Sequence, residues 1–162
     1  MQKPLVTGKN TPVLRTVCDA VTKFDGDLKN LVEDLRDTMT NKNEYGQIGI
    51  GIAAPQIGVT KRVMLVTFGV REKGKKSKIV VMVNPEIVSM SDDLVTMEEG
   101  CLSLPNQFGN VRRPSKVVAK WQTVDGNWSE KKLSGWDARI FLHELDHLNG
   151  VLFIDRMKQK KF

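Results

Sequence analysis

The chain has 162 residues, of which 40% are hydrophobic and 27% charged, ordinary proportions for a soluble globular protein. Its formal net charge is +6, it contains no apolar run long enough to span a bilayer, and residues 1–6 lack the apolar core of a signal peptide. These features exclude a membrane protein, and we expect one cytoplasmic domain over residues 1–162. The two cysteines, Cys18 and Cys101, cannot form a disulfide framework, and we expect Cys18 to be a small buried residue.

The first forty residues predict a loop region followed by an amphipathic helix. Residues 1–26 mix Pro, Gly and polar residues around a short helical turn at 12–15. Asp27 is a plausible cap, and the helix should end near 41–43. Its apolar residues follow helical spacing and should pack in the core: Leu28, Leu31, Val32, Leu35 and Met39.

A glycine- and isoleucine-rich stretch follows at 46–58. It is not a phosphate-binding loop, because no Gly-Lys-Ser/Thr sequence follows, and Pro55 interrupts the position where a dinucleotide-binding helix would run. Glycines within a strand-like run usually mark the close approach of another backbone or a ligand. A peptide substrate that pairs along an exposed strand edge would meet that requirement.

The middle of the chain predicts short strands and hairpins. Apolar, β-branched runs at 61–68 and 78–83 flank the basic stretch 73–78, Asn84-Pro85 suggests a turn, and 86–90 begins a further strand. The runs 117–122 and 128–133 bracket a strong hairpin signal at 124–127. With a helix at each end, this layout predicts an α+β fold of mixed or antiparallel short-stranded sheets.

The excess positive charge lies mainly at 73–78 and 158–161, which we interpret as a hairpin tip and a solvated terminus. Both are most simply solubilising surface. The alternative is weak electrostatic attraction to nucleic acid, including ribosomal RNA. No aromatic-interleaved basic patch or zinc-finger spacing is present, so we expect no specific DNA binding.

The sequence His143-Glu144-Leu145-Asp146-His147 lies in a predicted helix over 136–148 and contains both histidines of the chain. Side chains four residues apart on a helix project side by side, so His143 and His147 can bind one metal ion. Glu144 would then lie beside the open coordination position and could move a water proton. Asn149-Gly150 should break the helix, and 151–154 should pack back as an extended piece.

The third ligand separates classes of metal-dependent hydrolase. One class of zinc proteases needs a His six residues past His147, where this chain has Phe153, and another needs a downstream Glu, which is missing here. The ligand must therefore come from upstream, where Cys101 supplies a lone thiol. A set of one Cys and two His leaves a coordination position for water.

The chain resembles the peptide deformylases, which remove the formyl group from formylmethionine at the start of nascent polypeptides. Three motifs carry the resemblance in the family's order: 49–56, 99–103 and 143–147. It implies Cys101, His143 and His147 as metal ligands and Glu144 as the general base. It further implies Gln56 and the Leu102 N–H as oxyanion donors. Substrate pairing is implied for three residues: Ile50, Gly51 and Gly100.

The resemblance also implies Fe²⁺ as the native ion, with Ni²⁺, Co²⁺ or Zn²⁺ as substitutes, whereas ligand chemistry alone would favour Zn²⁺. Glu99 should form a supporting salt bridge with Arg113 or Arg112. Familiar bacterial relatives continue with a C-terminal helix that helps them dock on the ribosome. Its absence here puts such docking in doubt and would suit a virus or phage gene, with an unusual bacterial or organellar enzyme as the alternative. We expect the protein to act in the bacterial cytosol.

The stretch 106–110 lacks the basic residue that some relatives of the resembled family carry in this loop, and its Phe108 suggests an altered preference for substrate residues beyond the methionine. Two other functions compete with deformylation. A zinc peptidase shares the chemistry but lacks its usual third ligand here. A non-catalytic ribosome- or RNA-binding protein would use the positive charge but has no need of the complete catalytic set.

Overall fold

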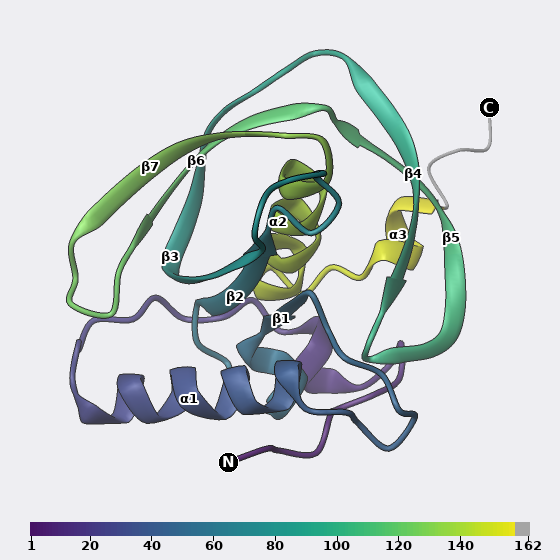
Figure 1. Cartoon of the computed structure of the whole chain (residues 1–162). Coiled ribbons are helices and arrows are strands. Elements are labelled where there is room, and N and C mark those ends of the chain that lie inside the picture. Colours follow the sequence, from purple (N-terminus) through teal and green to yellow (C-terminus); the bar gives the residue numbers. More distant parts are fainter. Residues whose placement is uncertain (158–162) are drawn as a thin grey trace.

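The computed structural model describes residues 1–157, so the predicted solvated terminus at 158–161 lies outside the described residues. Within them the chain forms strands, two longer helices and three short helical turns (Figure 1). In chain order the elements are η1 Pro12–Arg15, α1 Gly26–Thr40, β1 Gly51–Ala53, η2 Ala54–Ile57, β2 Val63–Phe68, β3 Lys78–Met90, β4 Leu94–Cys101, β5 Leu104–Pro114, β6 Lys116–Gln122, β7 Trp128–Ser134, α2 Gly135–Leu148 and α3 Phe153–Met157.

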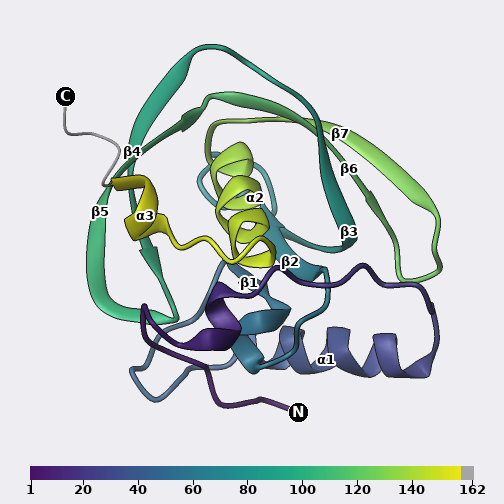
Figure 2. The same cartoon turned by 180° about the vertical axis from the view of Figure 1, so that it is seen from behind.

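The strands form two antiparallel sheets, one with the order β1-β2-β3-β6-β7 and the other made of β4 and β5. Figures 1 and 2, seen from opposite sides, both show α2 enclosed between the larger sheet and the β4–β5 hairpin. The predicted α+β architecture with antiparallel sheets and a helix late in the chain is confirmed. The enclosure of α2 places its side chains between strands that are distant in sequence.

Strand β2 forms the centre of the core because both of its faces are covered. Successive side chains of a strand point to opposite faces. Met64 and Val66 belong to the apolar cluster around α2, whereas Val63 and Leu65 pack with the residues of α1. The almost uninterrupted apolar sequence of this strand therefore follows from a helix on each side of the sheet.

The N-terminus of α1 differs from the prediction by two residues. The carboxylate of Asp25 accepts a hydrogen bond of 3.2 Å from the Leu28 N–H, so Asp25 and not Asp27 caps the helix. Asp27 lies within the first turn, where its negative charge interacts favourably with the positive end of the helix dipole. The helix ends at Thr40, close to the predicted end.

Two other predictions about local structure were wrong. Asn84-Pro85 is not a turn: β3 runs through it with a bulge, and Asn84 adopts a positive φ of 50°. The Asn84 side chain bonds both the N–H and the carbonyl of Val21 and the amide of Gln122, which holds this conformation. The predicted extended piece at 151–154 instead enters helix α3 at Phe153.

Several smaller expectations are confirmed. Cys18 is buried in the core cluster around α2, and the basic stretch 73–78 is exposed between β2 and β3. Among the described residues, none of the helices has the length and hydropathy needed to span a bilayer.

Candidate active site

Helix α2 and the end of β4 bring three potential metal ligands together. His143 and His147 lie one turn apart on α2, with ring centroids separated by 5.2 Å. Cys101 is the last residue of β4, and its Sγ lies 3.3 Å from Nε2 of His147. One ligand atom from each of the three residues lies within 4.8 Å of the other two. A thiol and two imidazoles at this spacing fit the donor set of a single divalent transition-metal ion.

Glu144 is buried beside this cluster. Its Oε2 has no hydrogen-bond partner within residues 1–157, and burial raises the pKa of its carboxyl to about 7. The side chain lies directly against β1, because a Cβ added at Gly51 would stand 2.6 Å from Oε1 of Glu144. Only glycine leaves this carboxylate in place, which gives a structural reason for Gly51.

The amide of Gln56 points its NH₂ group toward Cys101. Gln56 lies in η2 and is buried, and its Oε1 accepts a hydrogen bond of 2.9 Å from the Ala53 N–H. Its Nε2 therefore faces the other way, where it donates to Oγ of Ser103 at 3.1 Å and lies 3.6 Å from Sγ of Cys101. Ser103 belongs to the 99–103 motif, but sequence reasoning assigned it no role.

These groups open onto a cleft of about 350 Å³. Its lining includes eight of the nine predicted site residues: Ile50, Gly51, Gln56, Gly100, Cys101, Leu102, His143 and Glu144. The ninth, His147, is buried and reaches the cluster through Nε2. Trp136 and Ile140 from α2 line the same cleft, so the side chains N-terminal to His143 on the helix form part of its apolar surface.

Glu99 supports His143 from β4. Its Oε1 lies 2.7 Å from Nδ1 of His143, which turns the other ring nitrogen toward the cluster. Arg113 binds both oxygens of Glu99, at 2.7 and 2.9 Å, so it and not the exposed Arg112 is the predicted partner. Burial opposes the charged form of Glu99, yet hydrogen bonds from Arg113 and His143 outweigh it and hold the pKa of Glu99 well below its usual range.

The ion-pair network extends to residues that sequence reasoning missed. Arg139 of α2 is buried and donates to Oε2 of Glu99 at 2.7 Å and to the carbonyls of Val111 and Val95. Asp146 accepts from Arg113 at 2.7 Å and belongs to the same network. The sequence did contain a signal for this network, because Arg139 stands between two apolar residues on the buried face of the predicted helix. A charge buried there needs ion-pair or hydrogen-bond partners.

Comparisons with known proteins agree with this geometry. The family model of polypeptide deformylase matches residues 3–162. The peptide deformylase of Zymomonas mobilis is 41% identical over 152 residues, covering 93% of this chain and 83% of that protein. The crystal structure of peptide deformylase from Thermotoga maritima superposes with a TM-score of 0.84 at 38% identity, covering 96% of this chain and 97% of that chain.

A further solved structure, a Met-Ala-Ser-bound class I type b peptide deformylase from Acinetobacter baumannii, has a TM-score of 0.84 at 36% identity. It covers 96% of this chain and 99% of that one. The chain spans most of each of these relatives, and the match includes all three of its motifs. It therefore belongs to the peptide deformylases, the metal-dependent hydrolases that remove the formyl group from the N-terminal methionine of nascent polypeptides.

Proposed function

We propose that Cys101, His143 and His147 bind one divalent metal ion and that Glu144 is the general base of deformylation. The observation that carries the proposal is the convergence of three ligand atoms within 4.8 Å of one another next to a buried carboxylate. When bound, the metal would supply Lewis acidity and make a coordinated water more acidic. Glu144 takes a proton from the attacking water and delivers it to the departing amine.

Gln56 and the backbone N–H of Leu102 stabilise the negative charge that develops on the formyl oxygen. The Ala53 N–H holds the Gln56 amide with its NH₂ group toward Cys101, so this donor needs little reorganisation. Leu102 follows Cys101 and lines the same cleft. Removing one such donor typically costs about 10²–10³ in kcat.

The substrate backbone binds as an extended strand between two sheet edges. Strand β1 is an edge of the larger sheet, and β4 pairs within residues 1–157 only with β5. Ile50 and Gly51 at the first edge and Gly100 at the second line one cleft, where free backbone groups can pair with a peptide. The methionine side chain enters the apolar surface formed by Trp136 and Ile140. The Met-Ala-Ser bound by the Acinetobacter relative supports a peptide in this cleft.

The native metal in this proposal is Fe²⁺, the ion that the family resemblance implies, with Ni²⁺, Co²⁺ and Zn²⁺ as substitutes. Cys101 would bind as a thiolate, which is open to oxidation when it lies next to a redox-active ion. The enzyme should therefore lose activity in air with Fe²⁺ and retain it with Zn²⁺.

The chain acts in this proposal as one catalytic domain over 1–162, in the cytoplasm. Its contact with the ribosome is weak and electrostatic and uses the exposed basic stretch 73–78. Co-sedimentation with ribosomes should then weaken steeply between 50 and roughly 200 mM salt. Salt-independent co-sedimentation would contradict the electrostatic contact.

The test of the proposal combines metal analysis with product analysis. Anaerobically purified protein should contain one metal per chain and release formate from formyl-Met-Ala-Ser, and Cys101→Ser should lose both properties. Cys18→Ser, which changes the other thiol and leaves the three converging ligands in place, is the matched control for metal content. Cleavage of an unblocked peptide would instead favour a peptidase, and formate release without bound metal would contradict the metal site.

A further inference from the structure

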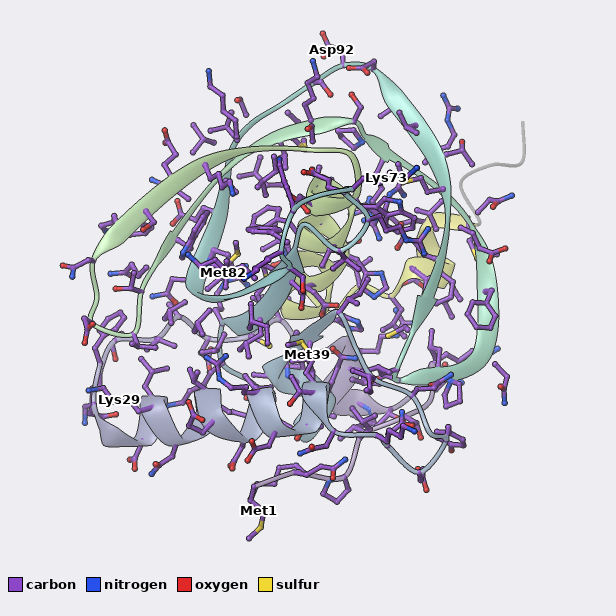
Figure 3. All side chains as sticks on the ribbon, in the orientation of Figure 1. Met1, Lys29, Met39, Lys73, Met82 and Asp92 are labelled. Atoms are coloured by element: carbon purple, nitrogen blue, oxygen red, sulfur yellow. The ribbon has the colours of Figure 1, made fainter. Side chains whose placement is uncertain are left out.

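The loop between β2 and β3 rests on the first turn of α2. The Gly69 N–H donates a hydrogen bond of 3.0 Å to Oδ1 of Asp137. Two residues later, Cζ of Arg71 lies 4.0 Å from the centre of the Trp136 ring. Figure 3 labels Lys73 on this loop, which passes in front of α2 in that view. The loop is thus fixed to the helix that carries the catalytic residues.

Arg71 is a free cation at the edge of the active-site cleft. It lines the cleft together with Trp136, and it has no ion-pair partner within residues 1–157. Stacking on an indole ring occupies one face of the guanidinium but leaves its N–H edges available. Those edges match the geometry of a carboxylate, which can accept two parallel hydrogen bonds from one arginine.

The proposed position of the peptide shows which part of it can reach this cation. Side chains of an extended chain alternate between two sides, so the third residue of the substrate faces the same side as the methionine. The methionine side chain contacts Trp136 and Ile140 in that arrangement, and Arg71 lies over the half-buried ring of Trp136. The third side chain therefore points toward Arg71.

We propose that Arg71, held against Trp136, is a specificity-determining residue that favours a carboxylate at the third position of the formylated peptide. This inference rests on the proposed function, because it uses the proposed position of the substrate. Three carboxyl groups also line the cleft: Glu99 is ion-paired with Arg113 and Arg139, Glu144 is buried, and the exposed Glu98 of β4 opposes a substrate carboxylate. In the proposed arrangement the guanidinium of Arg71 lies over Trp136, on the side that receives the methionine and the third side chain, so the preference follows Arg71.

The test compares kcat/KM for formyl-Met-Ala-Asp-Ala amide with kcat/KM for the matching Asn peptide. Both peptides are amidated, so neither carries a terminal carboxylate. A second pair, formyl-Met-Ala-Ala as free acid and as amide, measures separately whether a C-terminal carboxylate is recognised. An exposed charge pair predicts an Asp-to-Asn ratio of about two to five. Arg71→Gln should bring the ratio to about one, and Arg71→Lys should give an intermediate value, since it keeps the charge but loses the planar stacking.

Lys42→Gln is the matched control, because it removes a positive charge at an exposed residue that does not line the cleft. This variant should keep the wild-type ratio. For the wild type, 1 M NaCl should reduce the ratio, because the screening length at that salt concentration is about 3 Å. If formate is released but the Asp-to-Asn ratio of kcat/KM is the same in the wild type and in Arg71→Gln, the role of Arg71 is overturned and the proposed function stands. No formate from any peptide, despite bound metal, would overturn the proposed function as well.

Discussion

Replacing Arg139 by Leu tests whether the buried ion-pair network holds the β4–β5 hairpin against α2. The substitution removes three hydrogen bonds, one to the Glu99 carboxylate at 2.7 Å and two to the carbonyls of Val111 and Val95 at 2.8 and 2.7 Å. Arg139 is 3% exposed, so water cannot replace these partners without opening the interface. Breaking a buried pair of this kind costs about 3–5 kcal/mol.

Urea and thermal denaturation of the metal-loaded protein measure this cost. For a chain of this size the melting temperature should fall by roughly 6–20 °C. Arg112→Leu, at an exposed neighbour of Arg113, should change the free energy of unfolding by less than about 0.5 kcal/mol. A double-mutant cycle with Glu99→Gln should give a coupling energy of at least about 1 kcal/mol. A cost for Arg139→Leu as small as that for Arg112→Leu would refute the structural role of the network.

Three further results are expected. Gly51→Ala places a Cβ 2.6 Å from Oε1 of Glu144 and should lower kcat/KM by about 100-fold. Gly26→Ala meets no such neighbour, since nothing lies within 4 Å of the added Cβ, and it should raise the free energy of unfolding by about 0.5–1 kcal/mol. A chelator should lower the melting temperature and added metal should restore it, since a ligand at 100 times its Kd stabilises by about 2.7 kcal/mol. Phe108→Arg should alter the rate profile over the second and third substrate residues, because the Phe108 ring lies over Gly100; an unchanged profile would count against this.

The local part of the site could be predicted from the sequence because helix geometry sets it. A spacing of four residues on an amphipathic helix fixes the approach of His143 and His147, and no distant residue is needed to see it. Cys101 lies 42 residues before His143 in the chain, and only the missing downstream ligands and the family motif indicated it. Nothing local shows that β4 folds back on α2.

The missed features depend on contacts between distant segments. The partners of Arg139 lie on β4 and β5, so its burial as a charge could not be inferred from the pattern of α2 alone. Asn84-Pro85 has the composition of a turn, but the bonds from Asn84 to Val21 and Gln122 hold it as a bulge within β3. Near the C-terminus, an Asp155 carboxylate that accepts from the Leu152 N–H favours a helix over the predicted extended piece.

The most direct test of the central claim is formate release by Glu144→Gln with the bound metal measured in the same sample. The amide keeps the size of the side chain but cannot accept the proton of the attacking water. We expect one metal per chain, as in the wild type, and a loss of turnover of at least about 100-fold. Turnover near the wild-type rate with metal in place would contradict Glu144 as the base of deformylation.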